Sequence, residues 1–218
     1  MSTMDLDQYK KAWDNQPESV QKLSALDIYK MSQSKSSSIV KWIFIIGILE
    51  FAFWLSINYI VTKTGGFEPY EQLNLMGFLN YTTYLHYAVI LLFLLLFYRN
   101  YSAISTIDNT KTLMKKILKA RKTVKWYVYY NIISVVVLSL IFNILIINTP
   151  DGFALLTGVE NTNLTGGKMI AALIITQVFI VGIMVLILWL IYYLLYGILL
   201  KKLNKNFKEL SKLEEDNK

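Results

Sequence analysis

Four long runs of apolar residues divide the chain, and segments rich in polar and charged residues separate them. The runs cover residues 42–61, 78–98, 126–147 and 169–200. Each is long enough to cross the hydrocarbon core of a bilayer as a helix, which takes about 20 residues at about 1.5 Å per residue. Glu50 is the one residue within them that carries a formal charge. This pattern predicts four transmembrane helices.

The polar segments on one side of the predicted spans keep a helical period of their own. In residues 99–125 and in 201–218, apolar residues recur at spacings of three and four or multiples of these, with most lysines between them. Residues 1–38 contain two shorter helical patterns, and we expect their serine-rich end, Ser32–Ser38, to be a solvated and slightly frayed connector. Amphipathic helices should therefore flank a transmembrane domain of residues 39–200. The apolar positions of these two patterns are Ile104, Ile107, Met114, Ile117, Leu118 and Val124 in the first, and Leu203, Phe207, Leu210 and Leu213 in the second, which continues from Leu200 at the end of the last run.

The composition agrees with a membrane location. Of the 218 residues, 55% are hydrophobic and 17% are charged, and the mean hydropathy is +0.42. Soluble domains carry about 45–50% apolar and about 25% charged residues, so the apolar surplus here has to face lipid. The expected fold class is an all-α, polytopic membrane protein with four transmembrane helices and amphipathic helical extensions.

The distribution of positive charge predicts the orientation of the spans, because segments beside the membrane on the cytoplasmic side retain lysine and arginine. These residues number six in 1–41, eight in 99–125 and six in 201–218, against one each in 62–77 and 148–168. Both termini are therefore expected in the cytoplasm. The residues interpreted as an interfacial aromatic belt at the inner boundary are Trp42, Trp126, Trp189, Tyr192, Tyr193 and Tyr196.

The formal net charge of +7 is concentrated in the segment 99–125. Eight basic residues there accompany a single acid, Asp108, whereas the charges elsewhere balance. We interpret the segment as the orientation signal and as a surface attracted to anionic lipid of the inner leaflet. Nucleic-acid binding is not expected, because interleaved aromatic residues and any recognisable module are missing. The candidate lipid contacts are Lys115, Lys116, Lys119, Arg121, Lys122 and Lys125.

The apolar stripes outside the membrane need cover, and the sequence leaves its nature open. The helices could pack on one another as a small cytoplasmic bundle, lie on the inner leaflet, or bind a helix of a partner protein. A homo-oligomer is a further possibility, because four spans leave much surface facing lipid. The candidate partner surface consists of Leu6, Tyr9, Trp13, Leu26 and Tyr29.

Four polar residues fall at similar depth within the predicted spans, by a count of about 1.5 Å per residue from the span ends. They are Glu50, His86, Ser139 and Gln177. Ionisable residues at membrane depth are costly and are candidates for a functional site. One interpretation is a proton or solute site in which Glu50 and His86 share a proton. The other is a set of hydrogen bonds between helices, each worth about 0.6 kcal/mol on average.

The sequence offers little for catalysis or cofactor binding. It has no cysteine and one histidine, which excludes a disulfide framework, a thiolate site and most histidine-built metal centres. Motifs of nucleotide-binding proteins and hydrolases are also missing. We therefore expect no cofactor and no enzymatic activity. No glycine and proline pattern marks a broken helix within a span, and the isolated Gly47 and Gly182 are expected at helix contacts.

The first quarter of the chain resembles a known group of proteins. The resemblance rests on Tyr9-Lys10-Lys11-Ala12-Trp13-Asp14-Asn15-Gln16 and on the segments 23–31 and 35–42. These residues resemble the start of uncharacterised four-span proteins of the bacterial inner membrane, some of which carry a carotene oxygenase label. That activity would need iron held by several histidines, so it is not expected of this chain. The resemblance implies a bacterial inner membrane and no established function.

The expected function is that of a non-enzymatic accessory or regulatory protein, which binds a partner through its cytoplasmic amphipathic helices. Most of the amphipathic sequence lies on the inner side, whereas the outer segments are short. The alternative is a small transporter or proton-coupled transport component that uses Glu50 and His86. Membrane lipid and a protein partner or second copy are the expected binding partners.

Overall fold

Every element that the structure describes is helical. The computed structural model describes residues 25–106, 109–149 and 166–216. Four of its helices are long and apolar enough to cross a membrane, which confirms the predicted all-α fold with four candidate spans. The helices expected around Leu6, Tyr9 and Trp13 lie outside the described residues. The elements are α2 (Ala25–Lys63), α3 (Glu68–Gln72), α4 (Met76–Ser105), α5 (Thr110–Ile147), α7 (Gly166–Tyr192), η1 (Tyr193–Gly197) and α8 (Ile198–Asp216).

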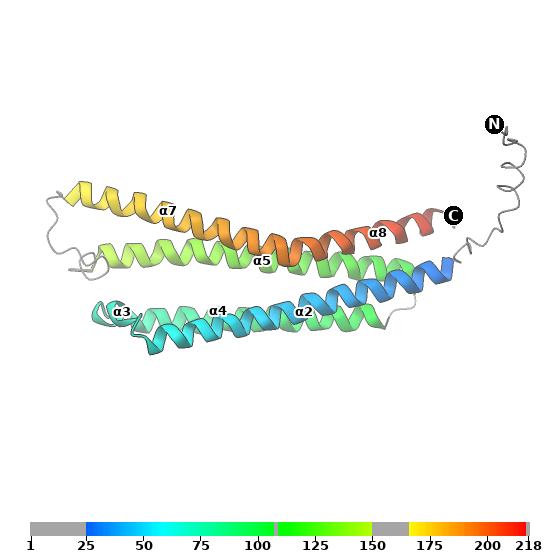
Figure 1. The fold of residues 1–218 in the computed structure, drawn as a ribbon, viewed down its shortest axis with the longest axis horizontal. Helices are drawn as coiled ribbons and strands as arrows, with labels where there is room; N and C mark the ends of the chain where they lie inside the picture. Colours follow the sequence, from blue (N-terminus) through cyan, green and yellow to red (C-terminus); the bar gives the residue numbers. More distant parts are fainter. Residues whose placement is uncertain (1–24, 107–108, 150–165, 217–218) are drawn as a thin grey trace, which may run out of the picture.

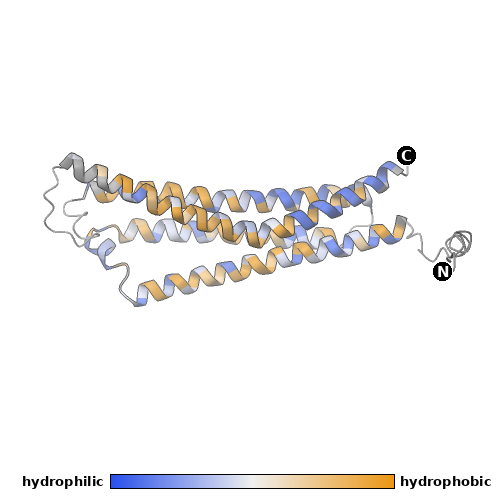
Figure 2. Cartoon of the chain, turned by 45° about the horizontal axis from the view of Figure 1, so that its top comes forward, coloured by the Kyte–Doolittle hydropathy of each residue, from blue (hydrophilic) through white to orange (hydrophobic). Residues whose placement is uncertain are grey.

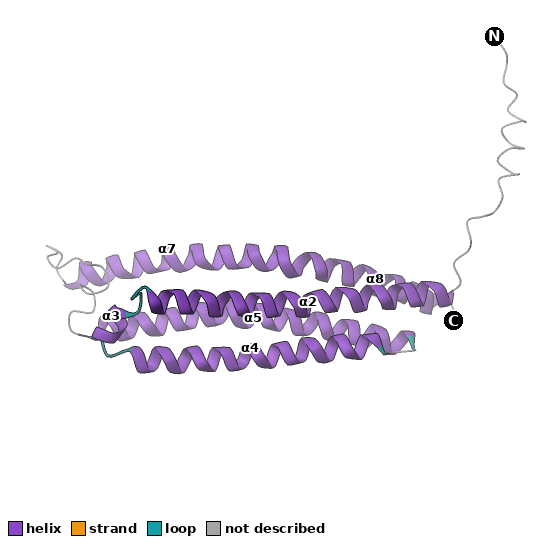
Figure 3. Cartoon of the chain, turned by 60° about the horizontal axis from the view of Figure 1, so that its bottom comes forward, coloured by secondary structure: helices purple, strands orange, loops and turns teal. Residues whose placement is uncertain are grey.

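The long helices lie side by side as an elongated bundle of four rods (Figure 1). The rods are α2, α4, α5 and the continuous unit of α7, η1 and α8. α2 begins and α8 ends at the same end of the bundle, and the short helix α3 lies at the opposite end (Figures 1 and 3). We call residues 25–41, 99–125 and 198–216 the terminal half. The remaining described residues, 42–98 and 126–197, form the apolar half.

Exposed apolar side chains form a belt around the apolar half. The large hydrophobic side chains that stay exposed are confined to residues 42–60, 81–98, 126–144 and 174–195, with four others in the terminal half. Figure 2 shows the corresponding change from hydrophobic α7 to hydrophilic α8 along one rod. The belt coincides with the four runs expected to face lipid, where exposure of apolar groups carries no penalty. The four exceptions are Leu26, Met31, Leu118 and Ile198, the first residue of α8.

The residues at two helix ends explain where the rods stop and start. α2 ends before Gly65, whose φ of 73° is readily adopted only without a side chain, and Gly66 N–H donates to the Val61 carbonyl at 3.0 Å. α5 starts after Asn109, whose side-chain oxygen accepts from the backbone N–H groups of the second and third residues that follow, at 2.9 and 3.4 Å. This is an asparagine N-cap, which satisfies donors that the first turn leaves free.

The serine-rich stretch is part of a helix, so the expectation of a frayed, solvated connector is wrong. α2 runs without interruption through residue 38. Ser32 and Ser36 are only 1% and 0% exposed, and Asn206 Nδ2 of α8 donates to Ser36 Oγ at 3.1 Å. Short serine side chains allow α8 to lie close to α2, and the amide satisfies one buried hydroxyl. These serines are therefore contact positions between helices.

The apolar stripes of the terminal half pack on one another. Helices α2, α4, α5 and α8 all contribute to one buried group of side chains, which we call the terminal cluster. Of the three arrangements that the sequence left open for these stripes, the structure therefore shows the one in which the helices pack on one another as a bundle. Ile107 and the side chain of Leu213 lie outside the described part of the chain. The terminal cluster consists of Tyr29, Val40, Ile104, Leu113, Ile117, Ala120, Leu203 and Leu210.

The two glycines expected at helix contacts differ in their surroundings. A Cβ atom on Gly47 would lie 2.9 Å from Leu94 Cδ2 and 3.4 Å from Phe97, so a side chain on this residue of α2 would force Leu94 of α4 to shift. A Cβ atom on Gly182 would meet nothing within 4 Å. The expectation is therefore correct for Gly47 and wrong for Gly182.

The fourth rod changes direction where a short π-helix, η1, joins α7 to α8 (Figure 1). A π-helical turn inside an α-helix is a recognised cause of such bends. α8 packs on α2 and α5, whereas α7 packs on α5. No comparable packing joins α7 to α2 within the described residues, so the bundle is less closed in the apolar half than in the terminal half.

Candidate functional site

Glu50, the charged residue of the four apolar runs, is held by tyrosine hydroxyls. Tyr192 donates to Glu50 Oε1 at 2.7 Å, and Tyr196 donates to Glu50 Oε2 at 3.0 Å. The ring of Tyr127 packs against the rings of both tyrosines, with centroids 6.1 Å from Tyr192 and 5.8 Å from Tyr196. A buried carboxyl group needs such partners, because removing it from water without them costs several kcal/mol or more. We call Glu50, Tyr127, Tyr192 and Tyr196 the carboxyl cluster.

The helices position this cluster at the bend of the fourth rod. Glu50 comes from the middle of α2 and Tyr127 from α5, while Tyr192 ends α7 and Tyr196 lies in η1. The rings of Tyr192 and Tyr196 lie 5.9 Å apart, and both face the bundle interior with exposures of 4% and 1%. The expectation that these two tyrosines belong to an interfacial aromatic belt is therefore wrong. Trp189 and Tyr193, on the other face, are exposed.

His86 has a different partner from Glu50. Its Nδ1 lies 3.1 Å from the hydroxyl of Tyr130, and the two rings stack with centroids 5.5 Å apart. The hydrogen bonds that Glu50 accepts from Tyr192 and Tyr196 do not involve this ring. The structure therefore does not bring Glu50 and His86 together as a pair that shares a proton.

The other two predicted residues do meet. Gln177 Nε2 of α7 donates to Ser139 Oγ of α5 at 3.0 Å. Asn143 Nδ2 also donates to the Ser139 carbonyl. The four polar residues expected at one depth thus belong to three separate groups, and each group links helices by hydrogen bonds.

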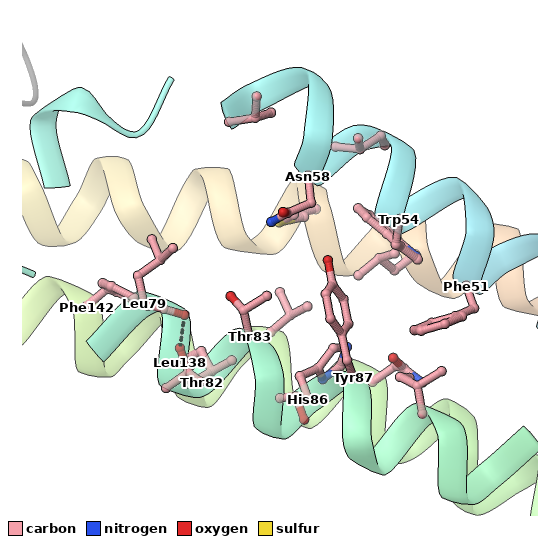
Figure 4. A pocket seen from close by; sticks show the side chains of 18 of the residues that line it. Phe51, Trp54, Asn58, Leu79, Thr82, Thr83, His86, Tyr87, Leu138 and Phe142 are labelled. Atoms are coloured by element: carbon pink, nitrogen blue, oxygen red, sulfur yellow. Dashed lines mark hydrogen bonds between the residues drawn. The ribbon is translucent and has the colours of Figure 1, made fainter. Parts of the chain in front are cut away.

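A cavity of ≈ 380 Å³ lies between the four rods in the apolar half. Aromatic and aliphatic side chains make up most of its wall (Figure 4). Tyr127 and Tyr192 of the carboxyl cluster also form part of it. This volume falls within the range of small-molecule sites, about 300–1,000 Å³. The wall consists of Phe51, Trp54, Ile57, Asn58, Val61, Phe67, Leu79, Thr82, Thr83, His86, Tyr87, Ile90, Tyr127, Asn131, Ser134, Val135, Leu138, Phe142, Met184, Leu188 and Tyr192.

Several polar groups in this wall lack a partner. The side chains of Asn58, Thr83, Tyr87 and Ser134 form no hydrogen bond with the residues that the structure describes. In Figure 4 the ring of Tyr87 extends from α4 toward α2, near Asn58. A polar group in an apolar environment costs about 1–3 kcal/mol if it stays unpaired. The described part of the wall contains no Lys, Arg, Asp or Glu side chain.

The cavity opens between α2 and α7. Among the described wall residues, Trp54 of α2 and Met184 of α7 are the exposed ones, at 38% and 44%. These two helices are the neighbours that do not pack closely on each other. Both residues also lie within the belt of exposed apolar side chains. The opening therefore faces the surroundings of the apolar half.

Sequence reasoning found Glu50, His86, Ser139 and Gln177 but missed most of the cavity wall. The tyrosines of the carboxyl cluster carried a signal, because Tyr192 and Tyr196 are four residues apart and so share a helix face. The sequence carries no comparable signal for Asn58, Thr83 and Tyr87, which are simply polar residues within an apolar run. Within the described ranges, no group of three His, Cys, Asp or Glu side chains is placed to hold a metal ion.

The fold and the cavity define a class: an all-α protein whose four long apolar helices can cross a membrane and enclose a mainly apolar cavity. Over residues 26–215 the chain matches the family described as a domain of unknown function, DUF8845, and it belongs to that family. This agrees with the expected membership of an uncharacterised family. Neither a curated protein nor a solved structure matches the chain.

Proposed function

We propose that this chain is a non-enzymatic integral membrane protein that binds a neutral, lipid-soluble molecule in the cavity of its apolar half. The observation that supports this most directly is the set of unpaired polar side chains in an otherwise apolar wall. A ligand with an apolar body and a few hydroxyl or carbonyl groups would satisfy these side chains. A charged ligand would meet no ion-pairing partner on the described wall.

The ligand would enter from the lipid, through the opening between α2 and α7. Trp54 and Met184 border this opening within the apolar belt. A molecule dissolved in the bilayer would therefore need no passage through water. Tyr87, Asn58 and Thr83 would then receive its polar group inside the cavity.

In this proposal the terminal half lies in the cytoplasm, and the membrane is a bacterial inner membrane. The excess of lysine and arginine near that end supports this orientation. With the inner boundary at Trp126, Lys122 and Lys125 lie within about 6 Å of it along α5, inside the headgroup layer. Lys115 and Lys116 lie about 15 Å or more away along the same axis, which is too far for steady lipid contact. Of the other two candidate contacts, Arg121 lies nearer the boundary than Lys119.

The partner-binding role stays a prediction. Its main motivation was apolar stripes without cover, and the terminal cluster supplies that cover from within the chain. Tyr29 is buried in this cluster, whereas Leu26 is 59% exposed. Leu6, Tyr9 and Trp13 lie outside the described residues. The transport role also stays a prediction, now without a direct Glu50–His86 contact.

The test is to identify what the protein carries when it is purified. The full chain is purified in a mild detergent, extracted with organic solvent, and the extract is analysed by liquid chromatography and mass spectrometry. The same is done with Ser134→Phe, which places a ring in the cavity, and with the matched variant Val137→Phe on the exposed side of α5. We expect a neutral amphipathic compound with the wild-type protein and with Val137→Phe, and its loss from Ser134→Phe.

Two results would contradict the proposal. One is the absence of any compound near stoichiometric amount in the wild-type preparation, and the other is an equal amount in Ser134→Phe and Val137→Phe. Thermal unfolding in detergent checks that both variants fold. Adding the identified compound at about 100 times its Kd should stabilise the wild-type protein by about 2.7 kcal/mol, as mass action requires.

A further inference from the structure

A second, polar cavity lies between α2 and α4 in the terminal half. Its volume is ≈ 430 Å³, and its wall is built mainly from lysine, serine and tyrosine side chains. It shares no wall residue with the cavity of the apolar half. We call it the basic groove. Its cations are Lys30 and Lys41, and its hydroxyl groups include those of Ser34, Ser37, Ser38 and Tyr101.

The sequence places these residues on one face of α2. Lys30, Ser34, Ser37 and Lys41 follow the spacing of four, three and four residues that repeats on a single face of an α-helix. The two lysines are about 16 Å apart along the helix axis, with the serines between them. Tyr101 and Ser105 of α4 form the opposite wall. The result is an elongated groove with a cation at each end and hydroxyl groups along its length.

The groove has unused positive charge and unused hydrogen-bond donors. Neither Lys30 nor Lys41 forms an ion pair with a residue that the structure describes, and the described wall includes no acidic side chain. The hydroxyl groups of Ser34, Ser37 and Ser38 donate no hydrogen bond to described residues. Serine in a helix often bonds to a carbonyl of the preceding turn, so its absence here leaves these donors free for a ligand.

From this geometry we propose that the basic groove binds a phosphate-bearing ligand. Lysine supplies charge to phosphate without fixed direction, and hydroxyl groups donate hydrogen bonds to its oxygens. Lys41 precedes Trp42, the first residue of the apolar belt, so one end of the groove lies beside that belt. The phosphate can therefore come from the headgroup of an anionic lipid or from a soluble compound. This site is independent of the ligand proposed for the apolar half.

The test compares two phosphate sources on the full-length protein. Native mass spectrometry in detergent measures adducts of phosphatidylglycerol against phosphatidylcholine, and calorimetry measures binding of inorganic pyrophosphate. The groove variant is the double substitution Lys30→Gln and Lys41→Gln. The matched control is Lys208→Gln and Lys212→Gln, which makes the same charge change on exposed residues of α8. Ser34→Asp is a second groove variant, which adds negative charge while both lysines remain.

We expect the groove variant to weaken at least one phosphate probe by about tenfold or more, while the control changes it by less than about twofold. Loss confined to phosphatidylglycerol assigns the site to lipid headgroups, and loss that includes pyrophosphate assigns it to a soluble ligand. Ser34→Asp should weaken the same probe. The proposal is overturned if the wild-type protein binds neither probe in preference to phosphatidylcholine, or if groove and control variants lose binding equally, since that shows attraction to net charge alone.

Discussion

Glu50 shows how one polar residue can join three helices at membrane depth. Each of its two carboxyl oxygens accepts a hydrogen bond from a tyrosine, so a single side chain of α2 contacts both the end of α7 and η1. The ring of Tyr127, which packs on Tyr192 and Tyr196, adds α5 to the same cluster. An isolated carboxyl group within an apolar run would be expensive, and the tyrosines offset that cost. At the scale of the residue, Glu50 is a connecting point between rods.

Replacing Glu50 should therefore destabilise the bundle in proportion to the hydrogen bonds lost. We expect Glu50→Gln to lower the free energy of unfolding by about 1 kcal/mol, because an amide can still accept one hydroxyl hydrogen bond. Glu50→Leu should cost about 2–3 kcal/mol, since both tyrosine hydroxyls then lose their acceptor in an apolar setting. Equilibrium unfolding in mixed detergent micelles measures both values.

The control for this prediction is Ser56→Leu, a substitution at an exposed position of the same helix. It should change the free energy of unfolding by less than about 0.5 kcal/mol. A Glu50→Leu protein as stable as the wild type would show that the carboxyl cluster contributes nothing to the joining of α2 and the fourth rod.

Among the elements, α2 lies close to α4 at a single small residue, Gly47. Gly47 lies against Leu94 and Phe97, whereas Gly182 on α7 faces open space. Gly47→Leu should destabilise the protein by about 1–3 kcal/mol, because the added side chain overpacks a filled contact. Gly182→Leu should be neutral or slightly stabilising, because leucine favours the helix and meets no neighbour.

The two glycine variants act as each other's control, since both make the same substitution within an apolar run. Their thermal midpoints in the same detergent measure the difference. If Gly182→Leu destabilised the protein as much as Gly47→Leu, the proposed difference between a packed and an open glycine would be wrong.

The elements themselves were largely predictable, because apolar runs and helical spacing depend on local sequence. Leu203 and Leu210 mark the buried face of α8 by spacing alone, and Asn109 has the side chain expected of an N-cap. Partners across helices were not predictable. From the sequence, Ser36 is expected in solvent, whereas in the structure it contacts Asn206 of α8. From the sequence, Tyr196 is expected at the membrane boundary, whereas in the structure it lies at the bend of the fourth rod and donates to Glu50.

For the whole molecule, the orientation in the membrane is the property that the next experiment should establish. The absence of cysteine makes single-cysteine labelling direct. Gln72 lies at the α3 end of the bundle and Lys212 in α8, and both are exposed. In intact cells, a membrane-impermeant maleimide should label Gln72→Cys, and it should label Lys212→Cys only after permeabilisation. The unsubstituted chain is the control, and labelling with the reverse pattern would overturn the proposed orientation.

The π-helical turn η1 also determines where in the fourth rod the protein can tolerate the deletion of a residue. Such a turn holds one residue more than an α-helical turn, so the helices on either side keep their own rotational phase. Deleting Leu194 should restore an uninterrupted α-helix and leave Leu203 and Leu210 in the terminal cluster. Deleting Lys201 should instead turn the following residues by about 100° and place Asn204 and Ser211 where Leu203 and Leu210 now pack. The fourth rod should therefore tolerate the deletion within its bend but not the deletion that lies one turn after the bend. The thermal midpoints of the two deletion variants would measure that difference.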